Sequence, residues 1–192
     1  MRLFVALFPP QDVREELWQR LREATARSSS PVRLTPVERW HLTLAFLGEV
    51  PDDDLSAVEL AISRIVAEGA GPGDRPVPGD GLGTGPGREI RLRLAGGGSF
   101  GKALWAGVDG DLTALDRLHG KLRRSLAEAG LLHDERPLAP HLTVSYRGGT
   151  PALRQALHGH SGRPWTAGEL TLVRSRHHEG GGYDVLRTWS LG

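Results

Sequence analysis

The apolar positions of this chain follow two spacings, one typical of strands and one typical of helices. Apolar side chains alternate in residues 2–8, which predicts a strand, because residues i and i+2 of a strand point to the same face. Leucines recur every three or four positions in residues 111–129, which predicts an amphipathic helix. The same reasoning predicts helices over 11–27 and from Pro51 to Val66, and strands over 90–95, 103–108, 169–175 and 183–190.

Glycine and proline mark the predicted connections between these elements. Residues 69–89 are dense in both, which predicts a long loop. The GGGSFGK segment at 96–102 predicts the turn of a hairpin, and Gly180–Gly182 predicts a second turn. The three aspartates at 52–54 follow Pro51. Negative charge there complements the dipole at the start of a helix, so we expect these aspartates to be structural rather than to bind a metal.

One tripeptide, His-Leu-Thr, occurs twice, at 41–43 and at 141–143. Histidine is scarce, with 8 copies in 192 residues, and each copy of the tripeptide opens an apolar run typical of a strand, HLTLAFLG and HLTVSY. In a strand the histidine and the threonine of each copy share one face, and the leucine between them points to the other. We expect Leu44 and Phe46 to lie on the leucine face of the first copy, packed in the core.

Two imidazoles, each with a hydroxyl beside it, suit the transfer of protons across a phosphate. The ordinary pKa of histidine is about 6.5, so at neutral pH one imidazole can hold a proton while the other accepts one. Threonine hydroxyls can donate hydrogen bonds to the non-bridging oxygens of a phosphate and orient it. We therefore predict that His41 and His141 are catalytic and that Thr43 and Thr143 bind the substrate.

The two halves of the chain have similar layouts, each with an HLT strand, further strands and a long helix. An internal duplication with pseudo-twofold symmetry would bring the two HLT strands together at a central groove. We therefore predict an α+β fold of two similar lobes, each an antiparallel sheet backed by helices. Together the lobes are expected to form a single bilobal domain that spans residues 1–192.

Composition narrows the chemistry further. The chain has no cysteine, which excludes disulfides, thiolate nucleophiles and cysteine-ligated zinc, and fits a reducing cytoplasm. The net charge of +1 argues against a long basic track, so any nucleic-acid contact is expected to be local. No stretch approaches the roughly 20 apolar residues of a membrane helix, and the N-terminal apolar run lacks a signal-peptide cleavage site. A cytoplasmic protein without membrane contact is expected.

Five segments match one known group: HLTLAFLG (41–48), PHLTV (140–144), RLFVALFPP (2–10), SFGKALWAGV (99–108) and GGGYDVLRTWSL (180–191). With these segments the chain resembles the two-histidine (2H) phosphoesterase superfamily. The similarity is to its bacterial RNA 2′,3′-cyclic phosphodiesterase branch, historically called 2′-5′ RNA ligase, and covers nearly the whole chain. One His-x-Thr motif would be weak evidence, but two with these flanks are specific.

The resemblance implies a cyclic phosphodiesterase that needs no metal and no other cofactor. It implies that His41 donates a proton to the leaving 3′ oxygen, that His141 accepts one from water, and that the product is a 2′-phosphomonoester. The reverse reaction, with a 5′-hydroxyl in place of water, would form a 2′-5′ linkage. We expect it to be a side activity, because water is far more concentrated than RNA ends. Members of this branch often carry a basic residue soon after the second motif, and Arg147 is the nearest candidate here.

Aromatic and basic residues near the motifs suggest how RNA could be bound. Aromatic side chains commonly stack the bases of single-stranded RNA, and basic ones contact its phosphates. The aromatic candidates are Tyr146, Trp40 and Trp105, and the basic candidates are Arg147, Arg174 and Arg176. We interpret the histidines at 158, 160, 177 and 178 as solvated turn residues rather than metal ligands.

Other functions stay open from the residues alone. The chain could instead be a phosphodiesterase for small cyclic nucleotides, such as ADP-ribose 1″,2″-cyclic phosphate, or an RNA-end binding module without catalysis. A histidine-rich metallohydrolase is a third alternative, which insensitivity to a chelator would exclude. The expected partners are RNA 3′ ends or small cyclic nucleotides, with no obligate protein partner, and a monomer is the default expectation.

Overall fold

The structure is a computed structural model that describes residues 1–26, 32–69, 89–176 and 182–191. Residues 70–88 of the predicted loop, and the segment His177-His178-Glu179, lie outside the described residues. The elements in chain order are β1 (Arg2–Leu7), α1 (Gln11–Ala26), η1 (Val37–Arg39), β2 (Leu42–Glu49), η2 (Asp52–Asp54), α2 (Leu55–Gly69), β3 (Ile90–Phe100), β4 (Ala103–Gly110), α3 (Leu112–Glu128), β5 (His141–Ser145), α4 (Pro151–His158), β6 (Trp165–Ala167), β7 (Glu169–Ser175) and β8 (Tyr183–Ser190).

The three long helices and the predicted strands are confirmed, whereas α4 and β6 were not predicted. These two elements have eight and three residues, too few to show a clear period. The start of α4 nevertheless carries a signal in the sequence. Thr150 caps the helix, its Oγ1 accepting a hydrogen bond from the Leu153 N–H at 3.3 Å, and Pro151 follows in the first turn.

The eight strands of the described residues form one curled antiparallel sheet, in the order β6-β3-β4-β5-β2-β1-β7-β8. The fold class is therefore confirmed as α+β, and the two predicted lobes share a single sheet. The strands that carry the HLT motifs, β2 and β5, lie next to each other at its centre. On either side the order is similar, because β1 flanks β2 as β4 flanks β5.

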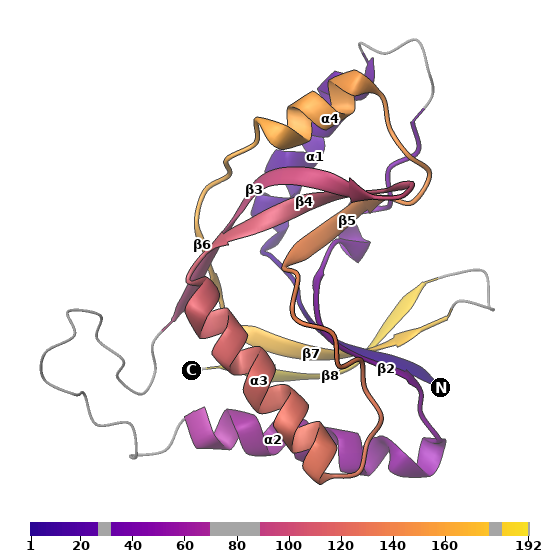
Figure 1. Cartoon of the computed structure of the whole chain (residues 1–192), viewed down its shortest axis with the longest axis vertical. Coiled ribbons are helices and arrows are strands. Elements are labelled where there is room, and N and C mark those ends of the chain that lie inside the picture. Colours follow the sequence, from indigo (N-terminus) through magenta and orange to yellow (C-terminus); the bar gives the residue numbers. More distant parts are fainter. Residues whose placement is uncertain (27–31, 70–88, 177–181, 192) are drawn as a thin grey trace, which may run out of the picture.

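The α-helices of the described ranges, α1 to α4, pack in two pairs at the two ends of the curled sheet (Figure 1). α4 packs against β3 and β4, and α1 packs against α4. α2 and α3 pack against each other, with α2 contacting β8 and α3 contacting β2. α1 follows β1 and α3 follows β4, so these two helices cross to the half of the sheet that does not hold their preceding strand, whereas α2 follows β2 and stays with the same half. No helix of the described residues is both long and apolar enough to cross a membrane.

A bulge in β2 corrects the predicted position of Phe46. The pairing with β1 places Ala6 opposite Thr43 but Phe4 opposite Phe46, with a register shift between them. An extra residue in one strand reverses which face the following side chains point to. Phe46 therefore lies on the face of Thr43 and not in the main core, and it packs in a second apolar cluster with Phe4 and Ala6.

The glycines at 96–98 also differ from their prediction, because they lie within β3 and not in the turn. The hairpin turn is shorter, at Gly101-Lys102. A Cβ atom on Gly97 would lie 2.6 Å from the carbonyl oxygen of Trp105 and 2.9 Å from Cβ of Leu157 in α4. Glycine at this position thus permits β4 and α4 to approach β3 closely.

We expect Gly97→Ala to lower the free energy of unfolding by about 1–3 kcal/mol, because the methyl group would be forced against a backbone oxygen and a packed helix. Gly168→Ala is the matched control, since a Cβ at Gly168 meets nothing within 4 Å, and it should change stability by less than about 0.5 kcal/mol. Urea denaturation of both variants measures this. Equal stabilities for the two would show that α4 does not depend on close approach at Gly97.

Candidate active site

The sheet brings the two HLT motifs side by side. β2 and β5 pair antiparallel with Leu42 opposite Leu142, and both leucines are buried in the main core. In this register the histidine of each motif lies across from the threonine of the other, on the opposite face of the sheet from the leucines. Side chains directly opposite in such a pair have Cβ atoms about 4.5–5.5 Å apart. The four residues predicted to act together thus form one cluster of two imidazoles and two hydroxyls.

The two imidazoles are held by the same local contact. The Nδ1 of His41 lies 2.7 Å from the carbonyl oxygen of Arg39, and the Nδ1 of His141 lies 2.6 Å from that of Ala139. A carbonyl oxygen only accepts, so in both contacts Nδ1 carries the hydrogen and donates. This fixes the tautomer of each neutral ring and leaves Nε2 of each available to exchange a proton with a substrate.

His41 sits in an aromatic cluster. Its ring stacks on Phe4 at 4.7 Å, makes an edge contact with Tyr183 at 5.3 Å, and lies tilted to the ring of Phe8 at 5.5 Å. Burial lowers its pKa to about 4, outweighing the hydrogen bond to Arg39, which raises the pKa. The neighbouring His141 lowers the pKa further. In the free protein at neutral pH, His41 is therefore uncharged.

His141 has a more open aromatic surrounding than His41. Its ring meets the edge of Phe100 at 5.2 Å and lies 6.2 Å from Trp105. Phe100 itself stacks on Trp105 at 5.2 Å and is 54% exposed. Aromatic side chains thus line both ends of the cluster, but only the side of His141 presents a broadly exposed ring.

The predicted base-stacking residues divide into exposed and buried ones. Tyr146 is 61% exposed, just beyond the second motif. Trp40 is fully buried, and its indole N–H donates to the carbonyl oxygen of Thr35 at 3.1 Å and to the hydroxyl of Thr35 at 2.8 Å. Trp40 is therefore a core residue, and the stacking role considered for it is wrong. Trp105 faces the site but is partly covered by Phe100.

The predicted basic residues also differ from one another. Arg147 is exposed. Arg174 and Arg176 both pair with Asp184, each at 3.1 Å, so both guanidinium groups are held by one carboxylate within the protein and are less available to phosphates. Among the residues that the structure describes, Arg147 has no carboxylate partner. It is therefore the arginine after the second motif that is best suited to contact a phosphate.

Two of the histidines predicted to be solvated can be placed. His158 is exposed at the end of α4, as expected. His160 is buried, so that prediction is wrong: its carbonyl oxygen accepts from Gly96 N–H at 2.8 Å, which joins the end of α4 to β3. Burial lowers the pKa of His160.

Within the described ranges no group of three or more histidine, aspartate or glutamate side chains is arranged to hold a metal ion.

Sequence reasoning missed the residues that surround His41. Phe4 and Phe8 lie on one face of the first strand by simple alternation, but nothing in β1 alone shows which strand packs beside it. Tyr183 lies far away in the chain and reaches His41 because β7 pairs with both β1 and β8. Burial raises the pKa of the Tyr183 hydroxyl, and the Arg39 guanidinium lies 5.9 Å from its ring centroid.

Known proteins resemble this chain over most of its length. A family model described as the 2′-5′ RNA ligase superfamily matches residues 8–179. The RNA 2′,3′-cyclic phosphodiesterase of Thermus thermophilus is 30% identical over 203 residues, which cover 100% of this chain and 90% of that protein. The protein of the same name from Escherichia coli is 30% identical over 145 residues, or 74% of this chain and 70% of its own. A third protein of this name, from Geobacillus stearothermophilus, is 27% identical over 86% of this chain. The matched region covers only 50% of the length of that protein.

Solved structures share the fold. Thermus thermophilus TT0787 superposes with a TM-score of 0.71 at 25% identity, covering 100% of this chain and 98% of the other. Escherichia coli LigT, crystallised in complex with 3′-AMP, also gives a TM-score of 0.71 at 25% identity, covering 99% and 97% of the two chains. The resemblance predicted from the two motifs is confirmed.

The lowered pKa of His41 predicts a specific dependence of stability on pH. Between the ordinary pKa of 6.5 and the folded value of about 4, the unfolded chain binds a proton that the folded chain does not, so stability falls as the pH falls through this window. The loss due to His41 is on the order of 3 kcal/mol by pH 4.

Urea denaturation between pH 7 and pH 4 tests this with two variants. His41→Gln should lose less stability than the wild type over this range, because the buried group that must stay neutral is gone. His158→Gln, an exposed control, should follow the wild-type curve. A His41→Gln curve parallel to that of the wild type would show that His41 titrates normally.

Proposed function

This chain belongs to the 2′-5′ RNA ligase superfamily, and from that premise we propose that it hydrolyses 2′,3′-cyclic phosphate ends of RNA to 2′-phosphomonoesters without a metal ion. Its similarity to proteins named RNA 2′,3′-cyclic phosphodiesterase supports this reaction class. The observation that carries the proposal is the pairing of β2 with β5, because it brings two imidazoles and two hydroxyls to one face of the sheet.

In the proposed reaction, water attacks phosphorus in line with the leaving 3′ oxygen. His141 takes a proton from the water as the new P–O bond forms, and His41 gives a proton to the 3′ oxygen as the old P–O bond breaks. The products are a 2′-phosphomonoester and a 3′-hydroxyl. Exchange with solvent then returns both histidines to their starting states. Each proton transfer of this kind contributes about 10²–10⁴-fold to the rate.

Thr43 and Thr143 are assigned to the non-bridging oxygens. Each lies across the β2–β5 pair from the histidine of the other motif, so a phosphate between the imidazoles has a hydroxyl within reach on either side. Such donors orient the phosphorus and stabilise the charge that develops on its oxygens. The exposed residues Tyr146 and Arg147 are assigned to the rest of the substrate, the first to a base and the second to a phosphate.

His41 requires a proton in order to act as the acid, although burial keeps it neutral in the free site. The cyclic phosphate carries a negative charge, and an opposite charge within about 4–6 Å favours the protonated imidazole. Binding of the substrate therefore supplies the condition for protonation, and the acid is formed only when there is a phosphate to act on.

We expect His41→Ala and His141→Ala each to lower kcat by about 10²–10⁴-fold. The measurement is hydrolysis of an oligoribonucleotide that ends in a 2′,3′-cyclic phosphate, in excess EDTA, with identification of the phosphate position in the product. His133→Ala, a histidine in the connection between α3 and β5, is the control and should retain the wild-type rate. Wild-type protein that is inactive in EDTA but active with a divalent metal would contradict the mechanism.

A substrate with sulfur in place of the 3′ bridging oxygen separates the two roles. Its leaving group is a thiolate, which departs without a proton because the ordinary pKa of a thiol is about 8.5. His41→Ala should therefore regain most of the wild-type rate on this substrate, whereas His141→Ala should not. Recovery by His141→Ala alone would exchange the roles of acid and base while leaving the cyclic phosphodiesterase activity in place.

A further inference from the structure

The acidic residues are distributed unevenly along the chain, although the net charge is only +1. No aspartate or glutamate occurs in residues 90–108 or in residues 136–168. These two ranges include all of β3, β5, α4 and β6 and most of β4. One half of the sheet and the helix over it therefore contain almost no negative side chain.

Hydrogen bonds hold three separate segments together at one end of this half. The Gly148 N–H, in the loop between β5 and α4, donates to the carbonyl oxygen of Lys102 in the β3–β4 turn at 2.7 Å. The Ser145 hydroxyl donates to the carbonyl oxygen of Arg33 at 3.0 Å and accepts from the Arg147 N–H at 3.2 Å. Figure 1 shows the β3–β4 turn beside the β5–α4 loop.

Each of these segments carries an exposed cation, and α4 adds a fourth. The four residues, which we call the basic surface, are Arg33, Lys102, Arg147 and Arg154. Over the ranges that the structure describes, none of them has a carboxylate partner. In the other half of the sheet the pattern is different, because the arginines at 174, 176 and 187 are all paired with Asp184 or Glu59.

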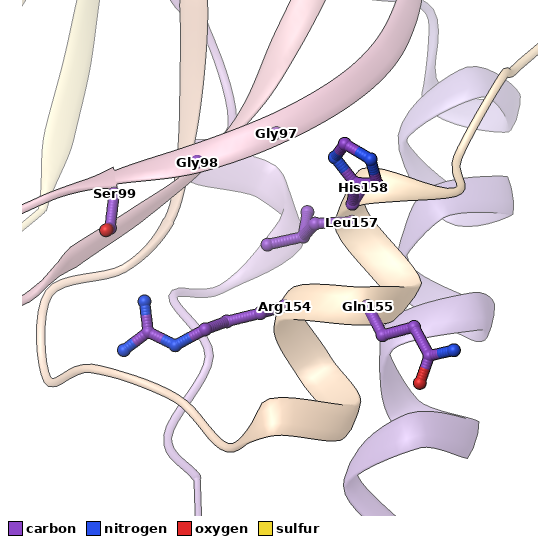
Figure 2. A pocket seen from close by; sticks show the side chains of 7 residues that line it. All are labelled: Gly97, Gly98, Ser99, Arg154, Gln155, Leu157 and His158. Carbon is purple, nitrogen blue, oxygen red and sulfur yellow. The ribbon is translucent and has the colours of Figure 1, made fainter.

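Arg154 lines a hollow of about 430 Å³ between α4 and β3. The backbone at Gly97 and Gly98 borders this hollow, and Figure 2 shows the Arg154 side chain extending from α4 towards Ser99. A guanidinium with a hydroxyl nearby suits a phosphate group, which takes charge-assisted hydrogen bonds from such donors. The hollow therefore offers one recessed place for a phosphate on the basic surface, beside the exposed side chains.

The basic surface begins where the face with the two histidines ends. Phe100, the last residue of β3, touches the ring of His141 and is broadly exposed. Lys102 follows two residues later in the turn. A strand whose 3′ end lies at His141 can therefore stack a base on Phe100 and continue to Lys102, and stacking of this kind tolerates any base.

We propose that Arg33, Lys102, Arg147 and Arg154 bind backbone phosphates of the nucleotides upstream of the cyclic end, so that the preferred substrate is an RNA strand and not a single cyclic nucleotide. This inference rests on the proposed function and names its substrate class. Contacts to backbone phosphates carry no sequence information, so the surface selects for length of the strand rather than for its bases.

The test is a triple variant, Arg33→Gln, Lys102→Gln and Arg154→Gln, which removes three charges of the surface and leaves the HLT motifs and Arg147 intact. We expect its kcat/KM on an oligoribonucleotide with a 2′,3′-cyclic end to fall about tenfold or more at low ionic strength. Its kcat/KM on a mononucleoside 2′,3′-cyclic phosphate should not change. The slope of log kcat/KM against log salt for the oligonucleotide should become shallower by about 2, because each phosphate that the protein no longer neutralises reduces the slope by about 0.7.

The matched control removes three exposed charges from α3, with Arg117→Gln, Lys121→Gln and Arg124→Gln. It changes the net charge by the same amount on a different helix, and it should leave both substrates and the salt slope unaffected. An equal loss from both triple variants would show an effect of net charge alone. An equal loss on both substrates from the first variant would place its residues at the cyclic phosphate itself. Either outcome overturns the proposal.

A binding measurement separates this proposal from the proposed function. Fluorescence anisotropy with a labelled single-stranded oligoribonucleotide that ends in a 2′-phosphate requires no turnover. The first triple variant should bind it at least about tenfold more weakly than the wild type does at low salt, and the α3 variant should bind it equally well. Unchanged affinity refutes the basic surface even if hydrolysis is observed. If hydrolysis fails but this difference appears, the surface stands and the catalytic proposal falls.

Discussion

The pairing of Leu42 with Leu142 is the constraint on which the rest of the site depends. A strand repeats every two residues, so a slip of one residue in either strand would turn its histidine into the core and its leucine out of it. Burial of a leucine contributes about 1.5–3 kcal/mol, and burial of an unpaired imidazole is costly. The two leucines therefore fix the register, and the register places each histidine across from the other motif's threonine.

The two motifs share their local geometry but not their surroundings. Both rings donate Nδ1–H to the carbonyl two residues before them, as expected if a single strand pattern were used twice. The difference comes from the neighbouring strands, since β1 and β8 bring Phe4 and Tyr183 to His41. The two imidazoles therefore differ in the aromatic side chains around them, and burial among those rings lowers the pKa of His41.

Periodicity and the repeated tripeptide were enough to predict the three long helices, the fold class and the cluster of four residues. The failures at Phe46 and His160 share one physical cause, which is contact with a chain segment distant in sequence. Phe46 changes face because β2 bulges against β1. His160 is buried where α4 returns to β3. Neither of these contacts leaves a local pattern in the sequence.

The low net charge argues against a long basic track, but it conceals a local imbalance. Segments without acidic residues are visible in the sequence, yet they matter only when packing joins them. In this protein, glycines permit the close packing that joins these segments. A Cβ on Gly97 would collide with Leu157 in α4, and one on Gly149 would collide with Leu104 in β4. Because these positions lack side chains, α4 and its preceding loop lie directly on the β3–β4 hairpin, and Arg147 and Arg154 come to share one surface with Lys102.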